Sequence, residues 1–196
     1  MARPRLAITL GDPRGIGPEV IAASLRQWGD AAPFIPVLVG PTGCGLTIDE
    51  PIGHWEDGGS VADAGRLAGR AIERATALAL AGTVDGICTA PIDKQALLAG
   101  GYDYPGHTEM LAALTGARTV MMLASERLRV VLVTTHLPLR DVPDALTAER
   151  IEETAAITRQ GLIDGFDIAA PRLALCALNP HAGDGGRFGR EDDERL

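Results

Sequence analysis

Two kinds of apolar pattern alternate along the first half of the chain. Apolar runs occur at Leu6–Leu10 and Phe34–Gly40, and a shorter strand-like segment at Asp85–Ala90; each ends against a glycine or a proline. Such runs are typical of buried strands. Between Val61 and Leu80 the apolar residues instead recur every three or four positions, and Ser60 precedes them as a candidate cap. This second pattern predicts a helix with one apolar face.

The second half repeats this alternation. Apolar runs at 119–124 and 128–135 are separated by three polar residues, a helical pattern follows over 147–163, and a last apolar run covers 172–178. Residues 41–60 show no clear period. Because strands alternate with helices through most of the chain, we expect an α/β fold with a mostly parallel sheet and flanking helices.

A glycine-rich loop at 11–17 joins the first predicted strand to a helix that begins at Pro18. A strand, a glycine loop and a helix together suggest anion binding. The dinucleotide fingerprint GxGxxG requires a glycine where Val20 stands, and the P-loop requires a lysine where Pro18 stands. Both standard nucleotide motifs are therefore rejected, and the loop is interpreted as structural.

His107 and Thr108 stand at the entrance to a predicted short helix over 109–114. Free backbone N–H groups, a hydroxyl and an imidazole at a helix start would form a cradle for a phosphate or a carboxylate. The simpler alternative is that Thr108 only caps the helix. The local sequence leaves both interpretations open.

His136 and His181 share a setting, because each follows an apolar run and begins a loop. If both runs are strands of one parallel sheet, the two imidazoles meet at the same edge, within reach of one divalent metal. Two histidines do not complete such a site, which normally has three protein ligands. Asp184 is a further candidate, although nothing fixes its direction.

Composition restricts the classes of partner. The 196 residues include 26 acidic and 18 basic side chains, for a net charge of −8, which argues against a nucleic-acid partner. Lys94 is the only lysine, and the three cysteines form no CxxC pair. Neither a signal peptide nor the ~18 consecutive apolar residues of a membrane span is found. We therefore expect a cytoplasmic protein that does not enter a membrane.

Five short motifs occur in a fixed order, and together they resemble the 4-hydroxythreonine-4-phosphate dehydrogenase family of vitamin B6 biosynthesis. The motifs are ITLGDPRGIGPEV (8–20), TAPIDKQAL (89–97), YPGHTEML (104–111), TTHLPL (134–139) and NPHAGDGGRFG (179–189). The resemblance implies the fold of isocitrate and isopropylmalate dehydrogenases, with two α/β domains around a cleft. It also implies a homodimer that uses NAD or NADP without the GxGxxG loop.

The same resemblance assigns roles to individual residues. His107 and Thr108 match a pair that contacts a phosphorylated substrate, and His136 and His181 match two of three histidine ligands of a divalent metal (zinc, magnesium or cobalt). Lys94 is interpreted as a cleft residue without an assigned role. The family's third metal histidine lies in a later segment, so we expect residues 1–196 to form the amino-terminal and central part of one dehydrogenase-like unit.

The reaction implied by the family is oxidation of the hydroxyl of 4-phosphohydroxy-L-threonine to a 3-oxo acid, which decarboxylates to 3-amino-2-oxopropyl phosphate. Three alternatives remain open. The substrate is another phosphorylated sugar acid or a cyclic diol carboxylate; the chain is a non-catalytic remnant that binds a metal or an anion; or it is a metallohydrolase, for which Asp184 is the only local general base.

Overall fold

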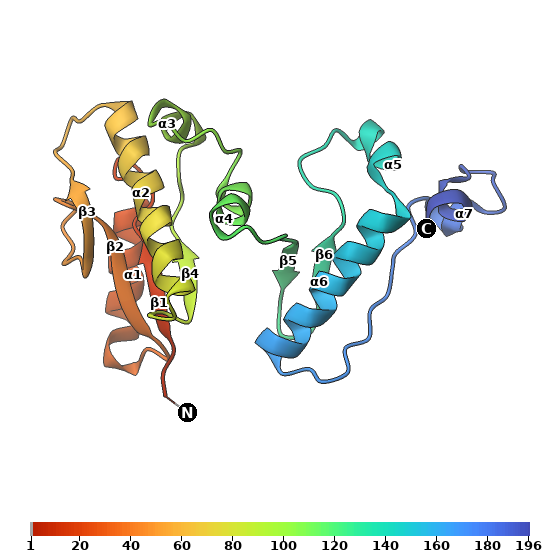
Figure 1. The fold of residues 1–196 in the computed structure, drawn as a ribbon, viewed down its shortest axis with the longest axis horizontal. Coiled ribbons are helices and arrows are strands. Elements are labelled where there is room, and N and C mark those ends of the chain that lie inside the picture. The colour runs from red at the N-terminus through yellow and green to blue at the C-terminus, as the bar shows by residue number, and fades with distance from the viewer. Residues whose placement is uncertain (1) are drawn as a thin grey trace. The chain divides into compact units, whose positions relative to one another are not determined.

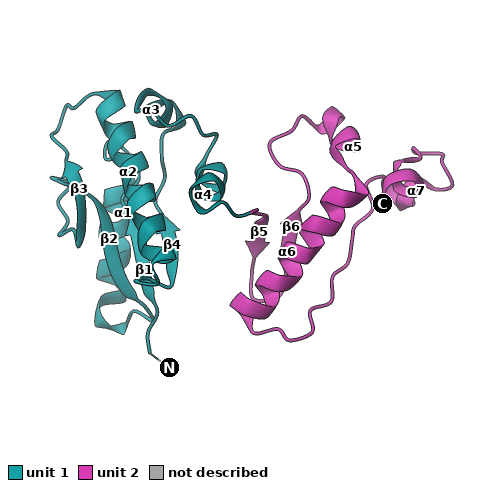
Figure 2. Ribbon diagram, viewed as in Figure 1, with its two compact units in different colours: residues 1–117 teal, residues 118–196 magenta. Residues whose placement is uncertain are grey.

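A computed structural model of the protein describes residues 2–196. These residues form two compact units, unit 1 up to Ala117 and unit 2 from Arg118 onward (Figure 2). Each unit has its own sheet and helices (Figure 1). None of the helices in the described part of the chain is both long enough and apolar enough to span a bilayer.

Unit 1 is built on a four-stranded sheet in the order β3-β2-β1-β4, and all of its strand pairs are parallel. The strands are β1 (Arg5–Thr9), β2 (Ile35–Thr42), β3 (Glu50–His54) and β4 (Gly86–Thr89). Pro36 is tolerated within β2 because Ile35 donates its N–H toward β1, to the carbonyl of Pro4, so the missing N–H of Pro36 faces the other side. Pairing with β3 begins only at Val39, beyond that position.

Helices cover both faces of this sheet (Figure 1). The helices of unit 1 are α1 (Gly17–Trp28), α2 (Val61–Leu80), α3 (Lys94–Ala99) and α4 (His107–Thr115). Ala7 of β1 packs in a cluster with residues of α2, whereas its neighbour Ile8 packs with Ile21 of α1. Successive side chains of a strand point to opposite faces, so a continuous apolar run is buried on both sides. The pairing of β1 with β2 and with β4 confirms the predicted strands 6–10, 34–40 and 85–90.

Helix α2 starts where the sequence predicted, because the Ser60 hydroxyl accepts the N–H of Asp63 at 3.0 Å. Its apolar face packs on the sheet, and its small residues allow α3 to approach closely. A Cβ added at Gly65 would overlap the carbonyl oxygen of Ala96, in α3. The ring of Tyr102 lies over Gly69 in the same way. The close packing of α2 and α3 therefore depends on glycine.

Unit 2 departs from the expected parallel arrangement. Its elements are β5 (Met121–Ala124), β6 (Arg129–Leu132), α5 (Val142–Ala145), α6 (Ala148–Phe166) and α7 (Glu191–Arg195), with short 3-10 turns at Leu139–Asp141 and Pro180–Gly183. Strands β5 and β6 pair antiparallel, as a hairpin closed by the N–H of Ser125 bonding to the carbonyl of Leu128 at 2.8 Å. A parallel pair requires a crossover of a dozen or more residues, which this short turn does not provide.

The predicted strand at 172–178 is wrong as a secondary-structure assignment. None of the strand pairs found in residues 2–196 includes this segment, and Leu173 and Leu175 are 46% and 52% exposed. An apolar run becomes a strand only when a neighbour accepts and donates its backbone hydrogen bonds. The helix predicted at 147–163 is confirmed as α6, and Thr147 caps it by accepting the N–H of Arg150 at 3.2 Å.

We predict that Gly65→Ala lowers the free energy of unfolding, by about 1–3 kcal/mol, because the added methyl group forces α2 and α3 apart. Urea denaturation followed by circular dichroism measures the change. Gly161→Ala in α6 is the matched control, since a Cβ there meets no atom within 4 Å. That control should gain up to about 1 kcal/mol from helix propensity. A Gly65→Ala protein as stable as the parent would contradict the packing described above.

Candidate functional site

The order of the strands in unit 1 creates a crevice at one end of the sheet. β1 lies between β2 and β4, so the chain leaves β1 toward one side and returns on the other. At such a switch point the loops after the two strands that flank it diverge, and ligands of open α/β sheets bind in the resulting crevice. In this sheet the switch point lies between the carboxyl ends of β1 and β4.

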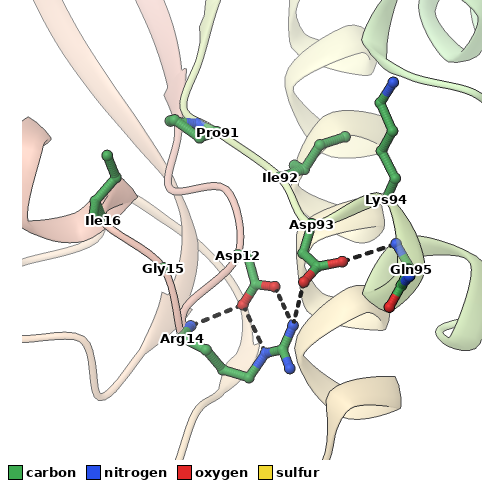
Figure 3. A pocket seen from close by; sticks show the side chains of 9 residues that line it. All are labelled: Asp12, Arg14, Gly15, Ile16, Pro91, Ile92, Asp93, Lys94 and Gln95. Atoms are coloured by element: carbon green, nitrogen blue, oxygen red, sulfur yellow. Dashed lines mark hydrogen bonds and ion pairs between the residues drawn. The ribbon is translucent and has the colours of Figure 1, made fainter.

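A pocket of about 590 Å³ occupies this position (Figure 3). Its lining comes from the loop between β1 and α1 and from the loop that leads from β4 into α3. The lining residues are Asp12, Arg14, Gly15, Ile16, Pro91, Ile92, Asp93, Lys94 and Gln95. The volume falls within the range of about 300–1,000 Å³ that is usual for small-molecule sites.

A charged network joins the two loops across the pocket (Figure 3). Asp12 is only 4% exposed, and its carboxylate accepts hydrogen bonds from Nε (3.1 Å) and Nη2 (2.6 Å) of Arg14. Nη2 also lies 3.4 Å from a carboxylate oxygen of Asp93. The hydrogen bonds from the guanidinium to Asp12 raise the pKa of Arg14. We call Asp12, Arg14 and Asp93 the clamp.

Asp93 has a second role, as the cap of α3. Its carboxylate accepts the backbone N–H groups of Gln95 (2.8 Å) and Ala96 (3.0 Å). These hydrogen bonds, that of Ala96 foremost, hold the pKa of Asp93 below its usual value. Lys94 follows as the first residue of α3, and its ammonium points away from the clamp (Figure 3).

The glycines of the 11–17 loop serve packing between the two loops. Gly11 has a φ of 71°, and a Cβ there would overlap the carbonyl oxygen of Pro91. A Cβ at Gly17 would overlap the carbonyl oxygen of Leu10. These positions are filled by neighbouring backbone, which agrees with the rejection of both phosphate-binding motifs and with the structural interpretation of the loop.

His107 and Thr108 are the first two residues of α4 in unit 1. The helix is preceded by Gly106, and no side chain caps its start, so the alternative that Thr108 is merely a helix cap is wrong. Nε2 of His107 is buried and has no hydrogen-bond partner among the described residues. Burial lowers the pKa of His107, because the charged imidazolium loses its hydration.

His136 and His181 both belong to unit 2, in exposed loop positions. β6 ends at Leu132, short of His136, and His181 lies inside the 3-10 turn after the unpaired segment. Both residues have left-handed backbone conformations, with φ of 57° and 55°. Such conformations are rare outside glycine and often occur at functional sites.

Imidazoles suit a divalent metal, but the described residues do not complete a site. Residues 2–196 contain no group of three or more His, Cys, Asp or Glu side chains arranged to hold an ion. The carboxylate of Asp184 is paired with Arg187 at 3.1 Å, which weakens its candidacy as a ligand or a general base. Two histidines alone would still leave such a site one donor short.

The clamp is a feature that the sequence did not reveal. Its members come from two loops that are far apart in the sequence: Arg14 and Asp93 are separated by 79 positions. One sequence signal could have revealed it: a charged residue follows each of β1 and β4 shortly after the strand ends, Asp12 in the first case and Asp93 in the second. Charged side chains at the carboxyl ends of adjacent parallel strands are expected to meet.

We predict that Asp12→Asn lowers the free energy of unfolding by about 1–3 kcal/mol, because Arg14 loses its buried anionic acceptor. The matched control is Asp63→Asn, which removes a carboxylate from an exposed pair with Arg66. The control should cost about 1 kcal/mol or less, since exposed ion pairs are weak. Thermal unfolding of the three proteins measures the difference, and equal losses in both variants would contradict a stabilising clamp.

We also predict that His107 makes stability depend on pH. Its folded-state pKa is below the value of 6.5 for a free imidazole. As the pH falls below that value the unfolded chain gains the proton first, so the folded state loses stability until its own imidazole is protonated. Denaturation at about pH 7.5 and about pH 5.5 should show a larger loss for the parent protein than for His107→Gln. Identical losses would rule out a buried neutral imidazole.

Two named relatives match most of the chain in sequence. The 4-hydroxythreonine-4-phosphate dehydrogenase of Geobacter metallireducens is 42% identical over 97% of this chain and 66% of its own length. The D-threonate 4-phosphate dehydrogenase of Salmonella typhimurium is 38% identical over 97% of this chain and 68% of its own length. The chain thus spans only 66% of the Geobacter relative's length.

The chain also matches solved structures and one family of proteins. The crystal structure of a 4-hydroxythreonine-4-phosphate dehydrogenase from Burkholderia phymatum matches with a TM-score of 0.82 at 33% identity, and the match covers all of this chain and 68% of that one. The predicted α/β fold class is thereby confirmed. Residues 44–196 match the family described as pyridoxal phosphate biosynthetic protein PdxA. The resemblance carried by the five motifs is correct, and the chain belongs to the PdxA family.

Proposed function

We propose that the protein is an NAD(P)-dependent dehydrogenase that oxidises the hydroxyl of 4-phosphohydroxy-L-threonine. A hydride passes from the carbinol carbon to NAD or NADP, and the hydroxyl proton is released. The resulting 3-oxo acid loses carbon dioxide to give 3-amino-2-oxopropyl phosphate. The proposal is supported by the Geobacter relative of that name, which is 42% identical over 97% of the chain.

The observation in unit 1 that carries the proposal is the start of α4. His107 brings a buried Nε2 without a partner to a helix start that no side chain caps. Unpaired N–H groups at the start of a helix attract anions, and Thr108 adds a hydroxyl donor beside them. We assign His107 and Thr108 to contact the phosphorylated substrate. Because its pKa is lowered, His107 is neutral near pH 7 and presents one donor and one acceptor.

We further assign His136 and His181 as two ligands of a divalent metal: zinc, magnesium or cobalt. Support comes from the imidazole nitrogen, a ligand between hard and soft that suits divalent metals, and from the left-handed backbone that both residues adopt. Such an ion, when bound, would act as a Lewis acid toward the reacting oxygen. The third donor is not among the groups that residues 2–196 bring together.

A homodimer is part of the proposal, and the surface of unit 2 supports it. Several large apolar side chains there are exposed: Leu123 (56%), Leu128 (63%), Val130 (43%) and Leu139 (87%). Leu123 and Val130 lie on the two-stranded sheet and Leu128 lies in its turn. Exposed apolar side chains of this kind are typical of surfaces covered by another chain or segment. We assign that role to a second copy of the protein.

A second candidate substrate is D-threonate 4-phosphate. The Salmonella relative named for it is 38% identical, close to the identity of the first relative. Both substrates carry a phosphate and a secondary hydroxyl, so the start of α4 does not distinguish them. Turnover measured with each compound decides between them.

We predict reduction of NAD or NADP by the purified protein with 4-phosphohydroxy-L-threonine and an added divalent metal. His107→Ala should lower kcat/KM by roughly 10-fold to 100-fold, the usual effect of losing one hydrogen bond to a charged group. His136→Ala should remove the stimulation by metal. His54→Ala is the matched control, because His54 lies on β3 and bonds to Thr42 instead. Absorbance of the reduced nicotinamide measures all four proteins.

The same assay also tests D-threonate 4-phosphate and a non-phosphorylated cyclic diol carboxylate. Turnover of D-threonate 4-phosphate alone would favour that second candidate substrate. Turnover of the diol alone would contradict the assignment of a phosphate to the start of α4. A folded protein that binds zinc but neither binds nor reduces a nicotinamide nucleotide would show a non-catalytic remnant instead.

A further inference from the structure

We propose that Asp192 and Glu191 are positioning residues for His181, because their carboxylates close the base of the loop that carries this imidazole. In taking His181 to be a metal ligand we rely on the proposed function. Helix α7, which contributes both carboxylates, thus has a task in unit 2: it holds the loop of residues 179–190 in one conformation.

Asp192 fixes the entrance of this loop. One oxygen of its carboxylate accepts the N–H of Leu178 at 2.7 Å, and the other accepts the N–H of Asn179 at 3.0 Å. Hydrogen bonds to a charged acceptor are about twice as strong as those between neutral groups. The segment before the loop has no strand partner among residues 2–196, so these two bonds hold the chain where it enters the loop.

Glu191 ties the entrance of the loop to its exit. Its Oε2 accepts a hydrogen bond from Nδ2 of Asn179 at 2.9 Å. Gly189, two residues before α7, leaves room for this contact, because its φ is 119° and a Cβ there would overlap Oε2 of Glu191. Helix α7 is itself anchored in unit 2, since Arg195 donates to the carbonyl of Pro143, in α5, at 2.9 Å. The base of the loop is therefore both closed and anchored.

Turns carry this constraint from the base of the loop to His181. The carbonyl of Asn179 accepts the N–H of Ala182 at 3.1 Å, and the carbonyl of His181 accepts the N–H of Asp184 at 3.1 Å. His181 and Ala182 lie within these turns with left-handed φ of 55° and 52°. Residues with a side chain disfavour this conformation, so it persists only where its surroundings hold it. Because His181 is exposed, hydrogen bonds rather than packing hold its backbone and thereby direct its imidazole.

The first test measures the backbone of His181 by NMR. A residue with positive φ has its amide and α hydrogens close together, so the nuclear Overhauser effect (NOE) between them is strong. We expect Asp192→Ala and Glu191→Ala to weaken this NOE at His181. Glu191→Gln should preserve it, because a carboxamide oxygen still accepts the same hydrogen bond. Asp193→Asn is the charge-matched control, since Asp193 is exposed on the same helix and its side chain has no hydrogen bond within residues 2–196.

The second test measures zinc affinity by competition with a chromophoric chelator. A loosened loop presents the imidazole correctly in a smaller fraction of molecules, so Asp192→Ala should raise the apparent Kd for Zn²⁺ roughly 10-fold. If Asp192 acts through His181, the two effects are not additive. The double variant of Asp192→Ala with His181→Gln should then bind zinc no more weakly than His181→Gln alone.

A weakened NOE in both alanine variants, with Asp193→Asn unchanged and zinc losses that do not add, supports the assignment. A strong NOE that persists in both alanine variants overturns it, and so do additive losses of zinc affinity. Circular dichroism reports whether each variant folds. Glu191→Ala and Glu191→Gln leave Asp192 in place and provide the same test if Asp192→Ala does not fold.

The failure of the proposed function has a different signature. Equal zinc affinity in the parent and in His181→Gln refutes the assignment of His181 as a metal ligand. The NOE alone then decides whether Asp192 and Glu191 position the loop, so the two failures are distinguishable.

Discussion

The contact between the loops after β1 and β4 sets the geometry of unit 1. The N–H of Asp12 donates to the carbonyl of Pro91 at 3.1 Å, and Gly11 makes the approach possible. With the loops at this separation the carboxylate of Asp12 is buried. Its lost hydration is compensated by the backbone N–H of Arg14, at 2.8 Å, and by a cation beside it. Arg14 provides that cation and reaches Asp93, which caps α3 and sets the position of Lys94. This one backbone contact thus determines the positions of the two loops at the end of the sheet, of the clamp and of the pocket between them.

Most of unit 1 could be predicted from the sequence, because β1 and the middle of β2 are buried on both faces and the main helix on one. Leu6–Leu10 and Val61–Leu80 carry these two patterns without interruption. β3 escaped prediction for the converse reason. It is an edge strand, Pro51 and Gly53 interrupt it, and Ile52 is its only large apolar residue. Edge strands need few apolar side chains and tolerate proline, so they leave little pattern.

The errors in unit 2 have a different physical origin. An apolar run predicts that a segment is buried, but it does not predict which neighbouring strand pairs with its backbone N–H and C=O groups. The hairpin of β5 and β6 could have been inferred from its short turn, whereas the unpaired state of 172–178 could not. The candidate site likewise has a part that the sequence predicted and a part that it did not. The motifs located His107, while the clamp depended on two loops far apart in sequence, and only the fold brings them together.

The left-handed backbone at His136 and His181 has a consequence for any ligand of these loops. Each such residue costs about 1–2 kcal/mol relative to the common helical conformation, and Ala182 adds a third beside His181. In exposed loops little packing holds this conformation in place. A ligand that requires it binds only the fraction of molecules that have adopted it, so its apparent Kd rises as that fraction falls. The affinity of these loops is therefore set by their backbone conformation as well as by their imidazoles.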